Sequence, residues 1–217
     1  MQAVILANGE FPKSQKCLDL LKNAPFLIAC DGAVQSLHAL QFKPSVVIGD
    51  LDSIDSHLKA LYNPIRMSEQ NSNDLSKAFF YALNKGFDDF IFLGLNGKRE
   101  DHALANTFLL LEYFKFCQKI QSVSDYGLFR VLETPFTLPS FKGEQISLFS
   151  LDLKAQFTSK NLKYPLKNLR LKTLFSGSLN EATDNFFSLS SEPKSVVLVY
   201  QKFLFYNNLS KTKSQLN

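Results

Sequence analysis

Short apolar runs alternate with amphipathic stretches along the first 125 residues of the chain. The amphipathic stretches are clearest at Asp74–Leu83 and Asp101–Phe114, where apolar residues recur at helical spacing. In the second stretch, one stripe is expected to face the core, namely Leu104, Phe108, Leu111 and Phe114. Strands are predicted at Ala3–Leu6, Phe26–Cys30, Ser45–Ile48, Pro64–Met67, Phe90–Leu93 and Lys119–Val123. This alternation predicts a parallel sheet with helices on both faces.

The pattern changes after Asp125, where the chain becomes rich in β-branched and aromatic residues with polar or Pro- and Gly-containing breaks. Strands are predicted there at Tyr126–Glu133, Gln145–Leu151, Asn185–Ser190 and Val196–Phe205. No helical periodicity stands out in this part. The pattern therefore predicts a small antiparallel sandwich or barrel after the α/β part.

Cysteine usage and hydropathy indicate the cellular setting. The three cysteines, Cys17, Cys30 and Cys117, are far apart and lack a CxxC spacing, which is unlike a disulfide framework or a zinc site. We expect them to be buried thiols. No apolar run approaches the roughly 20 residues that a membrane helix needs, and the N-terminus lacks the basic flank of a signal peptide. These features favour a cytoplasmic location without a membrane partner.

Charge is unevenly distributed along the chain, although the net charge is only +4. Residues 1–150 hold 14 basic against 16 acidic residues, a balance of −2, whereas residues 151–217 hold 10 against 4, a balance of +6. The lysines of the second part are scattered among strand-like runs rather than clustered. A solvated basic face fits this distribution better than a nucleic-acid partner.

Aspartates follow several of the predicted strands. Asp50 and Asp52 come directly after one strand, Asp31 and Asp101 follow two others, and Asp74 begins a helix. In an open parallel sheet, ligands bind beyond the carboxyl ends of the strands, so these five carboxylates are expected to meet at one rim. Their mutual repulsion would require cations, and Mg²⁺ with oxygen ligands is the natural choice.

Simpler interpretations exist for some of these acids. Asp31 precedes a glycine and fits a turn, while Asp74 and Asp101 fit helix caps. Asp50 and Asp52 are harder to explain in this way, because extended backbone would place their side chains on the same side. That pair favours metal or phosphate chemistry.

A second signal is the segment GLNGKREDH, from Gly94 to His102. Gly94 and Gly97 permit close approach of the backbone to a ligand, and the segment leads into a helix N-terminus, which favours anions. Lys98 and Arg99 add donors suited to phosphate. The segment matches neither the P-loop nor the dinucleotide fingerprint, so a plain strand–helix turn is the alternative, and His102 is either a ligand neighbour or a helix-start side chain.

Several segments together resemble the thiamin pyrophosphokinase family. They are ILANG, CDGA, PSVVIGDLDS, SNDLSKAF and GLNGKREDHALAN in the first half, and NLKYPL and SGSLNE in the second. The resemblance implies an N-terminal Rossmann-like α/β domain with a parallel sheet, residues 1–135, and a smaller C-terminal antiparallel β-sandwich, residues 136–217. It also implies a homodimer that transfers the β,γ-pyrophosphate of ATP to thiamine.

The same resemblance implies roles for individual residues. Mg²⁺ would be bound by Asp50, Asp52 and Asp74, with Asp31 and Asp101 completing the acidic catalytic site. ATP would contact Gly94, Gly97, Arg99, Asp101 and His102. Thiamine would lie near Ser178 and Asn180, contributed across the dimer interface.

The chain departs from the family pattern at a few positions. Lys98 stands in place of a second loop glycine, and Asn73 replaces the threonine before the helix aspartate.

Two other functions would suit clustered aspartates: a Mg²⁺-dependent phosphohydrolase, and a regulatory module that binds nucleotide or thiamine without turnover. The full set of carboxylates argues against the second, because binding alone rarely needs so many acids.

Overall fold

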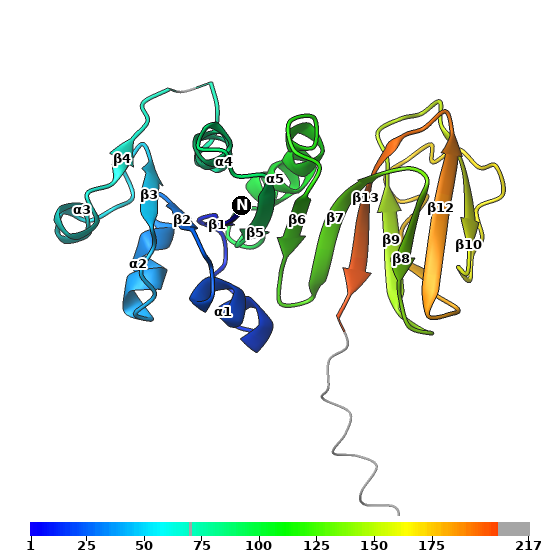
Figure 1. Cartoon of the computed structure of the whole chain (residues 1–217), viewed down its shortest axis with the longest axis horizontal. Helices are drawn as coiled ribbons and strands as arrows, with labels where there is room; N and C mark the ends of the chain where they lie inside the picture. The colour runs from blue at the N-terminus through cyan, green and yellow to red at the C-terminus, as the bar shows by residue number, and fades with distance from the viewer. Residues whose placement is uncertain (70, 204–217) are drawn as a thin grey trace, which may run out of the picture.

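A computed structural model describes residues 1–69 and 71–203 (Figure 1). All six strands predicted in the first half are present, and they pair in parallel in the order β4-β3-β2-β1-β5-β6. They are β1 (Gln2–Leu6), β2 (Leu27–Cys30), β3 (Val46–Gly49), β4 (Ile65–Arg66), β5 (Asp89–Leu93) and β6 (Ile120–Val123). The predicted parallel sheet is confirmed.

Helices cover both faces of this parallel part (Figure 1). One face carries α4 (Asp74–Asn84) and α5 (Glu100–Tyr113), and both were predicted. The other face carries α1 (Gln15–Lys22), α2 (Ala33–Ala39) and α3 (Ser56–Tyr62). None of the five helices in the described ranges has the length and apolar character that a membrane crossing requires. The three cysteines are buried and unpaired, as expected.

The predicted core stripe of α5 is wrong at its N-terminal end. Leu104 is 61% exposed, whereas Leu110, Leu111 and Tyr113 are the buried residues of the helix. Helical spacing identifies a stripe but not how much of it meets the sheet. Only the C-terminal half of α5 packs fully on the core, because its first turns lie at the rim where the strands end.

The β-rich second half extends the same sheet. β7 (Gly127–Glu133) runs antiparallel to β6, and the sheet then continues through β13 (Val196–Lys202), β9 (Gln145–Phe149) and β11 (Asn180–Glu181), giving ten strands in all. A three-stranded antiparallel sheet, β10-β12-β8, packs against this end. Its strands are β8 (Phe136–Pro139), β12 (Phe186–Glu192) and β10 (Gln156–Lys160).

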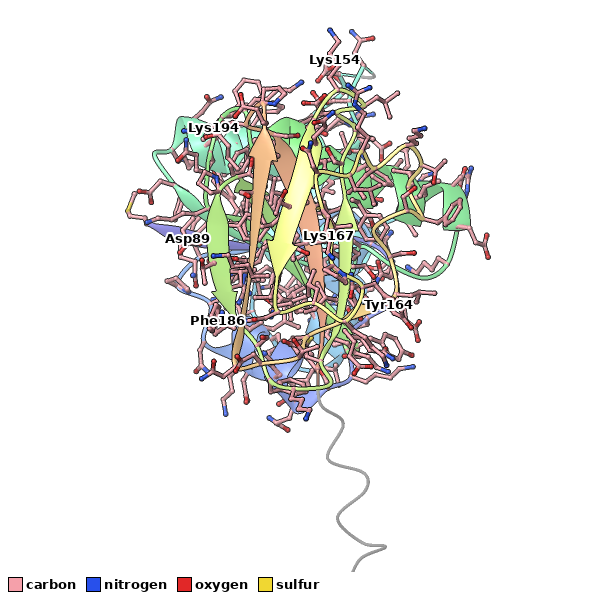
Figure 2. The ribbon with its side chains drawn as sticks, turned by 90° about the vertical axis from the view of Figure 1, so that its right-hand side faces the viewer. Asp89, Lys154, Tyr164, Lys167, Phe186 and Lys194 are labelled. Carbon is pink, nitrogen blue, oxygen red and sulfur yellow. The ribbon has the colours of Figure 1, made fainter. Side chains whose placement is uncertain are left out.

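This arrangement is a sandwich and not a closed barrel. Figure 2 looks at the molecule from this end, with the three-stranded sheet in front. The four strands predicted in this half are present, although Leu204 and Phe205 of the last one lie outside the described residues. β8, β10 and β11 were not predicted. The domain boundary after residue 135 stays a prediction.

Candidate active site

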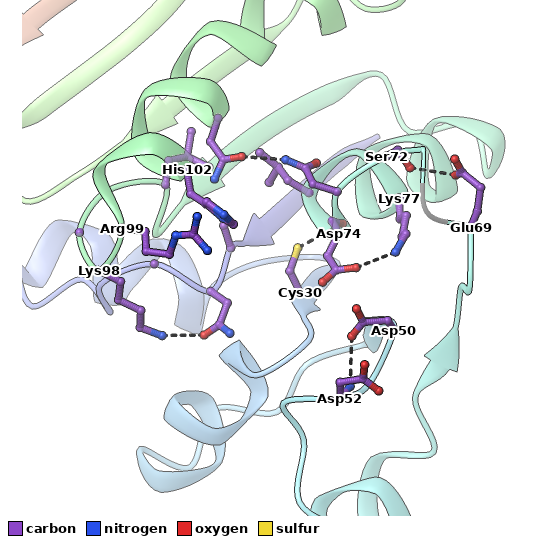
Figure 3. Close-up of a pocket in the computed structure, with 18 of the residues that line it drawn as sticks. Cys30, Asp50, Asp52, Glu69, Ser72, Asp74, Lys77, Lys98, Arg99 and His102 are labelled. Carbon is purple, nitrogen blue, oxygen red and sulfur yellow. Dashed lines mark hydrogen bonds and ion pairs between the residues drawn. The ribbon is translucent and has the colours of Figure 1, made fainter.

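A cavity of about 560 Å³ lies at the rim where the parallel strands end (Figure 3). Its walls come from the loops that follow β1, β3, β4 and β5, from the last residue of β2, and from the first turns of α4 and α5. This is the edge at which open α/β sheets bind ligands. The rim predicted from the aspartates therefore coincides with this cavity.

Three carboxylates gather at this rim. Asp31 follows β2, Asp50 follows β3 and Asp74 opens α4, and one oxygen of each lies within 4.8 Å of the others. Asp31 is only 4% exposed, and its Oδ1 has no hydrogen-bond partner among the described residues. Gly49 permits this approach, because a Cβ there would lie 2.8 Å from the Cβ of Asp31. A buried, unpartnered carboxylate oxygen requires a cation or a donor from outside the chain.

Burial and mutual repulsion shape the electrostatics of this group. Burial raises the pKa of Asp74, Asp50 and Asp31 raise it further, and Lys77 opposes them. The Lys77 ammonium is itself buried and lies 3.0 Å from Asp74 Oδ1. Within the described residues, Asp74 is the only one of the three acids that forms an ion pair. The excess negative charge and the all-oxygen donor set fit a hard divalent cation such as Mg²⁺.

Asp52 does not join this group, although it lines the cavity. The expectation of extended backbone between the two acids is wrong, because Leu51 has a φ of +72°. This left-handed residue turns the chain so that the backbone N–H of Asp52 donates to Asp50 Oδ1 at 3.1 Å. Asp31 stands in the group instead. The ligand role predicted for Asp52 stays a prediction.

Asp74 lies in the first turn of α4 but does not cap it. Asn73 is the N-cap residue, and its Oδ1 accepts a hydrogen bond from Ser76 N at 2.9 Å. The capping interpretation of Asp74 is therefore wrong, and its carboxylate is free to face Lys77 and the other acids.

The loop between β5 and α5 forms another wall of the cavity. Gly97, Lys98, Arg99 and His102 line it, whereas Gly94 lies behind them in a neighbouring depression. Gly97 has a φ of +77°, and a Cβ there would lie 2.5 Å from the Cβ of Glu10, so only glycine fits. Cationic side chains therefore face the same space as the acidic group.

Asp101 takes a different direction from the other acids. It is exposed, and its carboxylate receives two hydrogen bonds from Arg99, from Nε at 3.1 Å and from Nη2 at 2.6 Å. This contact with Arg99 lowers the pKa of Asp101. Asp101 does not line the cavity, and it caps no helix, because Arg99 occupies the N-cap position of α5. Its catalytic role stays a prediction.

Ser178 and Asn180 lie in the β-sandwich and do not line the cavity. Asn180 is 5% exposed, its Nδ2 donates to Tyr164 O at 2.7 Å, and its Oδ1 accepts from Tyr164 N at 3.1 Å. It thereby joins the segments NLKYPL and SGSLNE. The Ser178 hydroxyl donates to Phe175 O at 2.8 Å. Tyr164, labelled in Figure 2, and Phe175 are largely exposed beside this junction.

Sequence reasoning missed several residues of the cavity. Lys77 had a usable signal, because it stands three positions after Asp74 in a predicted helix and so shares its face. Asn106 had none: it accepts a hydrogen bond at 2.9 Å from Nδ2 of Asn73, which was noted only as a departure from the family pattern, and this contact between residues distant in sequence ties α4 to α5. Asn8 also had no individual signal, and its amide contacts Lys98.

Comparison with protein families gives two adjacent matches. Residues 17–122 match the model described as thiamin pyrophosphokinase, catalytic domain, and residues 127–200 match the model described as thiamin pyrophosphokinase, substrate-binding domain. Together the two matches span most of the chain. No curated protein matched the sequence.

Solved structures share the fold over nearly the whole chain. Thiamine pyrophosphokinase from Bacillus subtilis superposes with a TM-score of 0.78 at 22% identity, covering 94% of this chain and 100% of that one. Thiamin pyrophosphokinase from Candida albicans gives 0.76 at 17% identity, covering 94% and 89%. The yeast enzyme gives 0.76 at 14% identity, covering 93% and 86%. At these identities the structural likeness establishes the fold.

Proposed function

The chain belongs to the thiamin pyrophosphokinase family, and from this we propose that it transfers the pyrophosphoryl group of ATP to the hydroxyl of thiamine. The products would be thiamine diphosphate and AMP. The observation that carries the proposal is the group of Asp31, Asp50 and Asp74 at the rim of the parallel sheet. Acids that bind a cation, with Lys98 and Arg99 across the same cavity, suit a magnesium-bound triphosphate.

Asp31, Asp50 and Asp74 are the residues that we propose would hold Mg²⁺. The unpartnered Oδ1 of Asp31 and the all-carboxylate donor set support this choice. When bound, Mg²⁺ would neutralise phosphate charge and make the attacked phosphorus more electrophilic. Asp52 would lie beside the ion, because its backbone N–H is hydrogen-bonded to Asp50.

The residues of the chain would act mainly by positioning and by offsetting charge. The hydroxyl oxygen of thiamine would form a bond to the β-phosphorus of ATP, and the bond from that phosphorus to the oxygen of the α-phosphate would break, releasing AMP. Arg99 and the N-terminal turn of α5 would offset the charge on the phosphoryl oxygens. Asp101 does not line the cavity, which disfavours it as the acceptor of the hydroxyl proton.

We further propose that thiamine binds between two copies of the chain. The Ser178 and Asn180 side chains do not reach the cavity of their own chain, which supports a contribution from a partner. The match of residues 127–200 to the substrate-binding model supports placing thiamine on the sandwich. The three buried, unpaired cysteines support function in a reducing compartment such as the cytoplasm.

The proposal is tested by incubating the purified protein with ATP and Mg²⁺, with and without thiamine, and resolving the nucleotides. We expect AMP and thiamine diphosphate in equal amounts, and only when thiamine is present. Release of phosphate without thiamine would instead indicate a phosphohydrolase. Tight binding of either substrate without products would indicate a binding module.

Asp50→Asn provides the matched negative variant, because it removes one charge of the acidic group without changing side-chain size. It should abolish thiamine-dependent AMP formation while the circular dichroism spectrum stays unchanged. Asp55→Asn is the control: Asp55 lies outside the cavity and caps α3 through Leu58 N, and asparagine caps helices equally well. Near-normal turnover by folded Asp50→Asn would refute the assignment.

A further inference from the structure

Lys98 adopts a backbone conformation that lysine rarely takes. Its φ is +59°, in the left-handed region where the Cβ of an L-residue crowds the backbone. Gly97, directly before it, also has a positive φ. Backbone strain of this kind persists where the surrounding structure imposes it, and it gathers at ligand-binding sites. The conformation directs attention to what the side chain of Lys98 does.

The side chain of Lys98 lies along the cavity wall, where its Nζ donates to Asn8 Oδ1 at 2.8 Å (Figure 3). This partner is a neutral amide. Arg99, the other cation of the loop, is paired with Asp101. Within the described residues, no carboxylate lies within ion-pair distance of Lys98 Nζ. Of the two loop cations, Lys98 therefore carries the charge that the chain itself leaves unbalanced.

Asn8, the exposed partner of this ammonium, stands between Lys98 and the start of α2. On its other side it abuts Gly32, where an added Cβ would lie 2.8 Å from Asn8 Nδ2. The segment after Asn8 is tied to the β5–α5 loop, with Gly9 N donating to Gly94 O at 3.0 Å and Glu10 N to Asn96 O at 2.6 Å. A cation that already has a hydrogen bond at the cavity wall loses less entropy on binding an anion than one that has none.

From this geometry we infer that Lys98 is a binding residue for the polyphosphate chain of a nucleoside triphosphate. The inference rests on the proposed function and adds a specific contact to it. The ammonium is a compact point charge suited to non-bridging phosphate oxygens. It faces the cavity from the wall beside Arg99, so the ligand would lie between a cationic wall and the acidic group. The contact involves phosphate alone, and it should not depend on the base or on thiamine.

The test measures binding of inorganic triphosphate with Mg²⁺ by titration calorimetry. Lys98→Asn removes the charge but keeps a residue that tolerates left-handed backbone, and it should weaken binding about tenfold. Lys98→Arg should stay within about threefold of the unsubstituted protein. Added NaCl should narrow the difference between Lys98→Asn and the unsubstituted protein, because exposed charges are screened. In the steady state, Lys98→Asn should raise KM for ATP and leave kcat nearly unchanged.

Glycine variants separate the role of the charge from that of the strained backbone. Lys98→Gly should weaken triphosphate binding as Lys98→Asn does, while its Tm is not lowered. Gln41 is the matched control, because it has the same φ of +59°, is exposed and lies outside the cavity. Gln41→Gly should not lower the Tm, and it should leave triphosphate binding unchanged.

The inference is overturned if Lys98→Asn binds triphosphate normally, if Lys98→Asn and Lys98→Arg lose affinity equally, or if the unsubstituted protein does not bind triphosphate. Failure of the proposed function looks different. In that case the unsubstituted protein forms no AMP with thiamine, while Lys98→Asn still weakens triphosphate binding.

Discussion

The rim of the parallel sheet and the Asn180 junction of the β-sandwich each bury a polar side chain, but they treat it in opposite ways. Asp31 is 4% exposed and has an oxygen without a hydrogen-bond partner in the described chain. Asn180 is 5% exposed, and both ends of its amide are hydrogen-bonded to the backbone of Tyr164. The two side chains are therefore equally buried, but only that of Asn180 has all its polar atoms hydrogen-bonded.

The difference distinguishes two uses of a buried polar group. At the junction, both the nitrogen and the oxygen of the side-chain amide are hydrogen-bonded to another part of the chain, so the group contributes to folding. At the rim, the chain brings acids together and leaves them short of cations, which destabilises the fold unless a ligand binds. Loss of Asp31 should therefore affect activity, and loss of Asn180 should affect stability.

The largest effect is expected for Asp31→Asn. Removing one charge from the acidic group should lower kcat/KM for thiamine diphosphate formation by about 10³-fold, because a preorganised electrostatic contact is lost. The Tm without Mg²⁺ should not fall, since repulsion among the acids is relieved. Differential scanning fluorimetry should show that Mg²⁺ raises the Tm of the unsubstituted protein more than that of the variant. Activity within tenfold of normal would contradict the role of Asp31.

Asn180→Ala should show the opposite behaviour. It removes hydrogen bonds to Tyr164 N, Tyr164 O and Glu181 N, and leaves these part-buried backbone groups without that partner. We expect the free energy of unfolding to fall by about 3 kcal/mol and the Tm by roughly 10 °C. Thermal unfolding measures both. Asn185→Ala, at an exposed asparagine, is the control and should change the Tm little.

A third prediction concerns a buried acid in the sandwich end. Burial raises the pKa of Glu144, although Gln201 and Arg130 oppose it. The folded protein therefore keeps the proton of Glu144 up to a higher pH than the unfolded chain does. As the pH rises from the ordinary range of glutamate to this raised pKa, the free energy of unfolding falls.

Glu144→Gln removes that loss, because glutamine carries no charge at any pH. The Tm of the variant relative to the unsubstituted protein should rise as the pH rises through the ordinary range of glutamate, and level off above the raised pKa of Glu144. Thermal scans across this range test the sign. A relative Tm that falls with pH would show that the charge of Glu144 stabilises the folded state.

The smallest effect is expected for the ion pair beside Asn180. Lys163 Nζ lies 3.2 Å from Glu181 Oε2, and both side chains are exposed enough for water to screen the pair. Lys163→Met should lower the free energy of unfolding by about 0.5 kcal/mol or less. A loss as large as that of Asn180→Ala would mean that charge, not the amide, holds the two segments together.

The sequence was most informative where a strand runs directly into a functional residue. Apolar runs ending at Asp31 and Asp50 placed both acids at the carboxyl edge of a parallel sheet, and the structure brings them together with Asp74. That prediction needs only strand direction. Choosing Asp31 rather than Asp52 as the third member of the acidic group needed more information. It depends on the left-handed backbone at Leu51, and a leucine gives no sign of that conformation in the sequence.

Contacts between distant segments were beyond sequence reasoning. Asn180 was named for its resemblance to a family motif, but nothing local indicates that its amide binds Tyr164, sixteen positions earlier. Leu104 was assigned to the core because its helical phase is right, yet the sheet does not extend beneath the first turns of α5. Phase and propensity are local properties, whereas burial depends on where neighbouring elements end.

The pairing of β6 with β7 joins the two halves of the chain in one continuous sheet. A hinge motion between the halves would have to break the β6–β7 hydrogen bonds, so closure over substrates is expected from surface loops or from a second copy. Dividing the chain between Val123 and Gly127 would also leave β6 on one fragment and β7 on the other without their partner strand. Unpaired strand edges form hydrogen bonds with other chains, so the separate halves should aggregate rather than stay monomeric.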